Sequence, residues 1–251
     1  MIDLNGKSAV VTGGSRGIGE ACSRLLARAG ARVLINYRVE RASAERLVAS
    51  IVADGGEAIA VGADVSLADE AEMLVGEAAD RFGGPDILVN NAGVWKGSPI
   101  EEMTDGEWNE MIGINLTGTF NVIRAVVPYM KAAKSGTIIN ISSTAGQRGE
   151  SGHSHYAATK GGVISLTKSL AVELAGDGIR TNCVAPGWVE TDMSRQALEG
   201  DEGPAIRRAI PLGRPGRADE VAGAVLFLAS GLSTFVNGEV LNVNGGAVLC
   251  G

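Results

Sequence analysis

The feature that most constrains this chain is an alternation of short apolar runs with longer amphipathic segments along almost its whole length. The short runs are rich in β-branched residues, and the longer segments repeat apolar residues at helical spacing. We expect strands at residues 8–12, 32–36, 57–61, 86–90, 137–142, 179–185 and 239–243. We expect helices at residues 18–29, 42–53, 68–82, 108–133, 155–175 and 218–229.

Seven strands alternating with helices predict an α/β fold of the doubly wound Rossmann type. The sheet should be parallel and seven-stranded, because right-handed crossovers place helices over both of its faces. No repeat, low-complexity tract or linker divides the chain, so we expect one domain over residues 1–251. The 36 glycines fit many tight turns between strands and helices.

The alternation fails only over residues 187–215, a polar stretch with several prolines that follows the sixth strand. Ligands of open α/β sheets lie beyond the carboxyl ends of the strands. We therefore expect this segment to be a substrate lid.

Charge and composition argue against several classes of partner. The formal net charge of -7 does not favour nucleic acid, which needs clustered Lys and Arg. The chain begins without a basic segment followed by an apolar core, and no run is long enough to span a bilayer. We expect a cytoplasmic protein that takes a small soluble substrate or an ordinary protein partner and has no membrane partner.

The three cysteines, Cys22, Cys183 and Cys250, are too widely spaced for a disulfide framework or a C-x-x-C zinc site. We expect Cys22 and Cys183 to be small core residues. His153 and His155 form an H-x-H pattern, but no third ligand lies near them in the sequence, so no metal is expected. They are expected to line the substrate cleft or its rim, as Trp95 and Gln147 also could.

A glycine-rich loop stands between the first strand and the first helix. Glycines there permit a tight turn and let backbone N–H groups and the helix N-terminus approach a pyrophosphate. This position predicts a dinucleotide site. The expected cofactor-binding residues of the loop are Gly13, Ser15, Arg16, Gly17, Ile18 and Gly19.

The end of the second strand bears on the choice of cofactor. An acidic residue there would bind a free ribose 2′-hydroxyl and repel a 2′-phosphate, but this chain has Asn36, Tyr37 and Arg38. Arg16 and Arg38 could pair with a 2′-phosphate, which favours NADP(H). If Arg38 is an ordinary surface arginine, both NADP(H) and NAD(H) would be used.

Two further strand ends are expected to border the adenosine half of the cofactor. Asp64 follows the third strand, next to Val65, and its carboxylate could accept a hydrogen bond from the adenine amino group. After the fourth strand the string Asn90-Asn91-Ala92-Gly93 offers amides and small residues. We expect Asn91, Ala92 and Gly93 to bind the cofactor.

A candidate catalytic set lies between residues 115 and 160. Tyr156 and Lys160 are four residues apart on an expected helix, which places them on one face. Ser143 follows the fifth strand, and Asn115 is a polar residue within an apolar helical pattern. A tyrosine titrates near 10, so a nearby ammonium and a cationic nicotinamide would be needed to favour its phenolate.

These residues together resemble the classical short-chain dehydrogenase/reductase family. The resemblance rests on the T-G-x-x-x-G-x-G loop, the N-N-A-G string, Asn115, Ser143, the Y-x-x-x-K pair, and Pro186-Gly187 followed by Thr191. It implies a nicotinamide-dependent oxidoreductase that interconverts a carbonyl and a secondary alcohol. It also implies a homotetramer with residues 108–133 and 155–175 packed across a dimer interface.

The resemblance implies a role for each member of a tetrad. Tyr156 exchanges the proton with the substrate oxygen, and Ser143, rather than its neighbour Ser142, hydrogen-bonds that oxygen. Lys160 lowers the tyrosine pKa and holds the nicotinamide ribose, so Tyr156 and Lys160 also count as cofactor-binding residues. Asn115 anchors a water that links Lys160 to a proton relay. A further cofactor-binding set would brace the nicotinamide carboxamide: Pro186, Gly187, Val189 and Thr191.

Residues 186–193 and 243–246 resemble the 3-oxoacyl-[acyl-carrier-protein] reductases of the family, which act in fatty acid biosynthesis. This implies reduction of a 3-oxoacyl thioester by NADPH. One departure is Val172, where those reductases often carry an arginine for docking acyl carrier protein. Lys131 and Lys134 remain as candidates for that contact. Sugars, polyols or other ketones stay open as substrates, and a non-catalytic cofactor-sensing protein is a further alternative.

Overall fold

The computed structural model describes residues 2–249, and its centre is a parallel sheet in the order β3-β2-β1-β4-β5-β6-β9. Each strand begins and ends within one residue of its predicted bounds. The strands are β1 Ser8–Val11, β2 Arg32–Tyr37, β3 Glu57–Gly62, β4 Ile87–Asn90, β5 Gly136–Ile141, β6 Ile179–Pro186 and β9 Val240–Val243. The order reverses beside β1, as in doubly wound folds, so the predicted architecture is confirmed.

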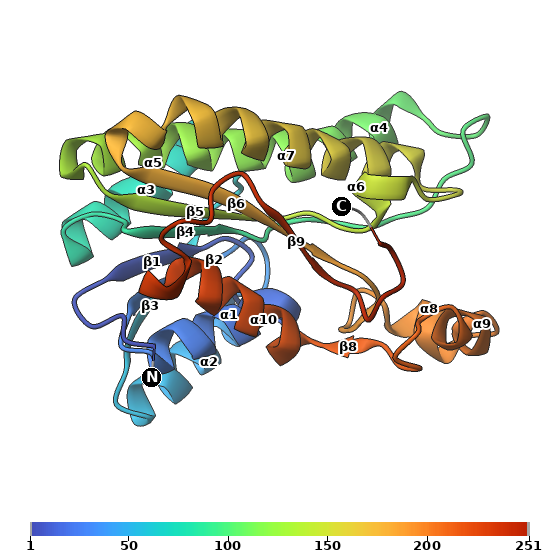
Figure 1. Cartoon of the computed structure of the whole chain (residues 1–251), viewed down its shortest axis with the longest axis horizontal. Helices are drawn as coiled ribbons and strands as arrows, with labels where there is room; N and C mark the ends of the chain where they lie inside the picture. Colours follow the sequence, from blue (N-terminus) through green and yellow to red (C-terminus); the bar gives the residue numbers. More distant parts are fainter. Residues whose placement is uncertain (1, 250–251) are drawn as a thin grey trace.

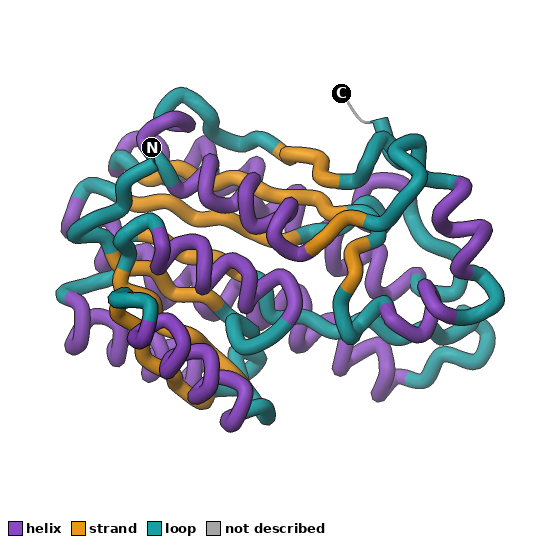
Figure 2. Tube along the Cα trace, turned by 90° about the horizontal axis from the view of Figure 1, so that it is seen from below, coloured by secondary structure: helices purple, strands orange, loops and turns teal. Residues whose placement is uncertain are grey.

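Helices cover both faces of the sheet, as Figure 1 shows. One face carries α1 Gly17–Arg28, α2 Arg41–Ala53 and α10 Ala218–Ala229. The other carries α3 Ala68–Phe82, α5 Gly118–Ala133 and α7 Ser154–Glu173. Seen from the side of α1, α2 and α10 (Figure 2), the helices lie along the strands, as crossover connections require.

The two faces of the sheet each bury an apolar cluster. Along β1, Val11 packs with the α1 and α10 side chains, whereas Val10 packs with those of α3 and α5. Successive strand residues point to opposite faces, so a strand buried on both sides needs a continuous apolar run. Cys22 and Cys183 are buried free thiols, as expected. Cys250 lies outside the described residues.

The helix predicted at residues 108–133 is continuous, but it begins earlier and contains a π-helical turn that was not predicted. The segment is α4 Asp105–Ile112, a π-helical turn Gly113–Thr117 and α5 Gly118–Ala133. The first helix begins early because Thr104 forms a capping box with Glu107. The π turn surrounds Asn115, whose side chain is bonded to the backbone of Val94.

The excursion at residues 187–215 contains ordered pieces. They are β7 Val189–Glu190, α8 Arg195–Glu199 and α9 Gly203–Arg208, and β7 pairs with β8 Gly216–Arg217. Shorter elements elsewhere are α6 Ala145–Arg148 and the 3-10 turns Ala175–Asp177 and Gly231–Ser233. Within residues 2–249, no helix combines the length and the apolar character that a bilayer crossing needs.

Candidate active site

A cleft lies where β4, β5 and β6 end, at the carboxyl edge of the sheet. Apolar groups dominate its walls, and it brings together residues that are far apart in the sequence. The predicted site residues in the lining are Ile18, Asn91, Gly93, Ser143, Tyr156, Lys160, Pro186, Gly187, Val189 and Thr191.

Ser143 and Tyr156 face each other in this cleft. The Ser143 hydroxyl hydrogen-bonds Tyr156, and its Oγ also accepts from the Ala145 N–H at 3.1 Å, which holds it at the end of β5. Ser142 donates instead to the carbonyl oxygen of Lys160 at 2.8 Å. The geometry therefore singles out Ser143 as the hydroxyl that is paired with the tyrosine.

Burial shifts the two titratable groups of the cleft in opposite directions. It raises the pKa of Tyr156 to about 12, with a smaller upward contribution from the Glu150 carboxylate, and the hydrogen bond from Ser143 opposes the shift. Burial lowers the pKa of Lys160 to about 8. The Lys160 Nζ donates to the carbonyl oxygen of Ile141 at 2.8 Å and lies 5.8 Å from the centroid of the Tyr156 ring.

Asn115 lies behind the cleft and does not line it. It is fully buried, and its side chain forms two hydrogen bonds with the backbone of Val94, accepting at 2.8 Å and donating at 2.9 Å. A Cβ on Gly93 would lie 3.2 Å from Asn115 Oδ1 and 3.6 Å from Lys160 Nζ. Asn115 thus fixes the segment after β4 against α7.

The glycine loop is shaped as a dinucleotide site requires. Gly13 and Gly17 have positive φ angles of 57° and 54°, which favour glycine. A Cβ on Gly19 would overlap the Gly13 carbonyl oxygen and lie 2.5 Å from Asn91 Nδ2. The first N–H groups of α1, from Gly17 onward, have no partner within the helix and lie beside the cleft.

Neighbouring polar side chains hold this loop in place. Asn91 Nδ2 donates to the carbonyl oxygens of Thr12 and Gly13, and the Ala92 N–H donates to Thr12 Oγ1. Asn36 is buried, accepts from the Gly13 N–H at 3.2 Å and donates to the Ala63 carbonyl at 3.0 Å. The side chain of Asn36 therefore supports the loop.

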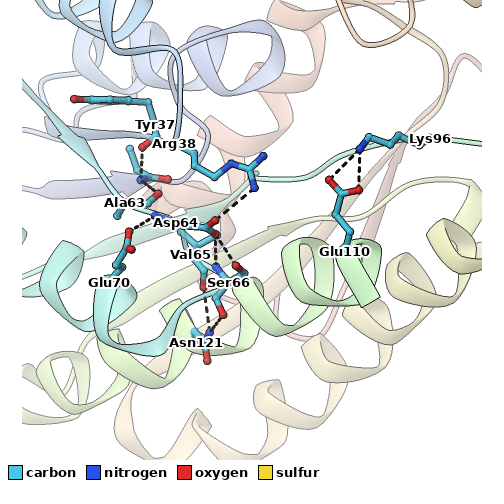
Figure 3. A network of polar contacts seen from close by, with 11 residues as sticks. Tyr37, Arg38, Ala63, Asp64, Val65, Ser66, Glu70, Lys96, Glu110 and Asn121 are labelled. Atoms are coloured by element: carbon cyan, nitrogen blue, oxygen red, sulfur yellow. Dashed lines mark hydrogen bonds and ion pairs between the residues drawn. The ribbon is translucent and has the colours of Figure 1, made fainter. Parts of the chain in front are cut away.

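The ends of β2 and β3 meet in the polar network of Figure 3. Asp64 accepts from the Ser66 N–H and hydroxyl, and it pairs with Arg38 across 3.4 Å. The hydrogen bonds from Ser66 and the charge of Arg38 lower the pKa of Asp64, although partial burial acts against them. Arg38 is about half exposed, at 48%, so this ion pair is weakly held.

Four further predicted cofactor residues do not line the cleft. Ser15 is buried in the glycine turn, and Arg16 is exposed at the N-cap of α1. Val65 is buried, with its carbonyl accepting from Asn121, and the Tyr37 ring packs against Gly62. These four residues surround the ends of β1, β2 and β3.

Several residues of the lining were not predicted as site residues: Val94, Ile141, Thr144, Ala145, Arg148, Glu150, Trp188, Met193 and Ser194. Position in the fold is the signal that could have found them, since they lie at the ends of β4, β5 and β6 or in the segments that follow these strands. Trp95 lines the cleft, whereas Gln147 bonds Asn242 at 2.8 Å outside it. His153 lies behind Trp95, and His155 is buried in α7.

Comparison with known proteins agrees with this geometry. The family described as enoyl-(acyl carrier protein) reductase matches residues 13–248. A 3-oxoacyl-[acyl-carrier-protein] reductase of Synechocystis is 44% identical over 99% of this chain and all of its own length. The reductase FabG of Staphylococcus epidermidis is 43% identical over 96% of this chain and 98% of its own.

A solved structure gives the same result for the fold. A dehydrogenase/reductase from Sinorhizobium meliloti superimposes with a TM-score of 0.93 and is 38% identical, covering 98% of this chain and 97% of its own. The similarity thus spans the glycine loop, the tyrosine–lysine helix and the lid segment. The chain therefore belongs to the short-chain dehydrogenase/reductase family, whose members use a nicotinamide cofactor.

Proposed function

We propose that the chain reduces a 3-oxoacyl thioester to the 3-hydroxyacyl thioester with NADPH. The observation that carries the proposal is that Ser143, Tyr156 and Lys160 line one cleft. This cleft is at the edge of the sheet where the glycine loop lies. The names of the relatives support the thioester as substrate.

The chain's residues fit a nicotinamide dinucleotide. Gly13 and Gly17 form a tight turn, and Gly19 has no room for a Cβ. The backbone N–H groups at the start of α1 would therefore bind the pyrophosphate. Pro186 to Thr191 border the cleft and would hold the nicotinamide half, whereas Asn91 to Gly93 at the end of β4 would border the adenosine half. The bound cofactor supplies the hydride.

Ser143 and Tyr156 would bind the carbonyl oxygen of the substrate, because both hydroxyls face the cleft and can donate. When the carbonyl carbon receives the hydride, the Tyr156 O–H gives its proton to that oxygen and the alcohol forms. The tyrosine is left as a phenolate, which the Lys160 ammonium stabilises. With a pKa of about 8, Lys160 keeps most of its charge at neutral pH.

Asn115 acts in this proposal as a positioning residue. The side-chain amide of Asn115 is bonded to Val94 through both its oxygen and its nitrogen. A water of the proton relay would therefore bind the main-chain carbonyl oxygen of Asn115, which also accepts from Thr119 at 2.9 Å. Loss of the side chain would release the segment that carries Gly93 and Val94.

The preference for NADPH rests on the end of β2. No carboxylate stands at its tip, and Arg38 is held only by the exposed pair with Asp64. Arg16, exposed at the start of α1, forms no ion pair with another described residue. A 2′-phosphate would offer both guanidinium groups a stronger partner than Asp64 gives Arg38.

Residues 187–215 are proposed to act as a lid on the substrate. Trp188, Thr191 and Met193 of this segment line the cleft, while α8 and α9 lie beyond it. A lid of this kind would exclude water from the reacting carbonyl.

Carrier-protein docking at Lys131 and Lys134 faces a geometric constraint. Both residues end α5, at the amino edge of the sheet, and Lys131 is paired with Asp177 across 3.1 Å. The cleft is at the opposite edge. A carrier protein would have to reach around the molecule or meet these lysines on a neighbouring protomer.

A neighbouring protomer is part of the proposal, as a homotetramer with α5 and α7 at one interface. Three apolar side chains on these helices are strongly exposed in the single chain: Phe120 at 44%, Tyr129 at 42% and Val172 at 82%. Pairing α5 and α7 across a two-fold axis would cover them.

The test of the function is oxidation of NADPH in the presence of acetoacetyl-CoA. The oxidation is measured as the loss of the absorbance of the reduced nicotinamide. NADH and a panel of sugars and simple ketones serve as comparisons. The proposal predicts thioester reduction that is faster with NADPH than with NADH. Turnover confined to a sugar or polyol would move the chain to another branch of the family.

A further inference from the structure

Three aromatic side chains close the substrate end of the cleft, and we call them the aromatic wall: Trp95, His153 and Trp188. The Trp95 ring stacks on His153 with centroids 4.6 Å apart and planes within 2° of each other. Trp188, from the start of the lid, meets Trp95 edge-on at 5.7 Å and 87°. Trp95 and Trp188 line the cleft that contains Tyr156, and His153 backs Trp95 from outside.

The wall is braced by the segments on either side of it. Trp95 Nε1 donates to the Glu150 carboxylate at 3.4 Å, and the Ser98 N–H donates to the Gly152 carbonyl at 2.8 Å. These bonds tie the segment after β4 to the turn before α7. For Trp95 to swing away it must give up one hydrogen bond and two aromatic contacts.

His153 is itself held from behind. Its Nδ1 lies 3.1 Å from the Ser151 carbonyl oxygen, and a Cβ on Gly97 would lie only 2.9 Å from its Nε2. His153 therefore packs close to Gly97, where a larger side chain would not fit. The space behind the imidazole is limited on that side.

The room in front of the wall is small. The cavity volume of the cleft is about 150 Å³, which corresponds to roughly ten water-sized groups at 10–15 Å³ each. The nicotinamide ring and the reacting thioester must share this space. With the nicotinamide ring bound, little of the 150 Å³ would be left for an acyl chain.

We propose that the aromatic wall sets the length of the acyl group, so that the chain favours a short 3-oxoacyl thioester of the acetoacetyl type over long ones. The inference rests on the proposed function and adds the class of acyl group to it. A long acyl chain has to displace Trp95, whereas a methyl group stops short of it. Trp95 and Trp188 are thus specificity-determining residues, and His153 is a positioning residue that keeps Trp95 in place.

The experiment compares kcat/KM for acetoacetyl-CoA and 3-oxodecanoyl-CoA, with the preferred nicotinamide cofactor. The wild type should favour acetoacetyl-CoA. Trp95→Ala should raise the ratio of long to short substrate by about tenfold or more, the effect of about 1.4 kcal/mol. Trp108→Ala is the matched control, because Trp108 lies on α4, is 41% exposed and does not line the cleft. It should leave the ratio unchanged.

Two further variants keep the test decisive if Trp95→Ala folds poorly. His153→Ala should shift the ratio in the same direction by a smaller factor, and Trp95→Phe should retain most of the wild-type preference. A wild type that prefers the long thioester, or a ratio that neither Trp95→Ala nor His153→Ala changes, would overturn the inference. A wild type that reduces no thioester but reduces another ketone would instead overturn the proposed function.

Discussion

The buried ammonium of Lys160 is expected to lower the stability of the folded protein while it supports activity. Lys160 is only 5% exposed, and burial lowers its pKa from 10.5 to about 8. That fall corresponds to roughly 3 kcal/mol of free energy against the charged form in the folded protein. Lys160→Met removes the charge with little change of shape but also the charge-assisted bond to the Ile141 carbonyl, worth about 1.5–3 kcal/mol. We expect the variant to be inactive and more stable by up to about 1.5 kcal/mol at neutral pH.

The dependence of this gain on pH follows from proton linkage. Below pH 8 Lys160 is charged in both the folded and unfolded states, so the whole penalty is present. Between about 8 and 10.5 the folded protein gives up the proton while the unfolded chain keeps it, and the wild type gains stability as the pH rises. The stability of Lys160→Met relative to the wild type should therefore fall by roughly 3 kcal/mol over this range.

Urea unfolding of the ligand-free protein at several pH values, at one protein concentration, measures both effects. Lys168→Met is the matched control, because Lys168 is exposed on the same helix. It should change stability little at any pH. A Lys160→Met variant that is less stable than the wild type at neutral pH, or a difference that does not vary with pH, would refute the reasoning.

Three other predictions concern the cofactor site and the proton donor. Arg38→Ala should weaken NADPH far more than NADH, measured by titration of cofactor fluorescence, and equal weakening of both would contradict the assignment. Gly19→Ala should weaken both cofactors, because the new Cβ overlaps the Gly13 carbonyl oxygen; unchanged binding of either would exclude this loop as the pyrophosphate site. Glu150→Gln removes a negative charge that raises the Tyr156 pKa. The pH profile of alcohol oxidation, which needs the phenolate, should move to lower pH, and a shift to higher pH would oppose the role of Tyr156.

Much of the fold was predictable because the parallel sheet is buried on both faces. A run such as residues 33–35 is apolar on both faces, so its length and its flanking turns define it well. The bounds of α3 and α10 were also predicted correctly, since each follows a polar turn and keeps an apolar stripe. The local sequence pattern was sufficient to predict an element wherever the element packs against segments that are close to it in the sequence.

The π-helical turn at Asn115 was not predictable by pattern, because the apolar spacing continues through it. It depends on hydrogen bonds to Val94, 21 residues earlier in the chain. The same holds for the aromatic wall, where Trp95, His153 and Trp188 come from three separate loops. The sequence named Trp95 and His153 as possible cleft residues, but only the packing of the loops shows that the two rings stack.

The most direct test of the account is the effect of Tyr156→Phe on reduction of acetoacetyl-CoA by NADPH, with NADPH affinity measured in parallel. The substitution removes one oxygen and leaves the ring in place. We predict that kcat falls by about 10² to 10⁴, as expected for a lost general acid, while the affinity for NADPH stays close to that of the wild type. A variant that keeps most of its turnover would contradict the assignment of Tyr156 as the proton donor.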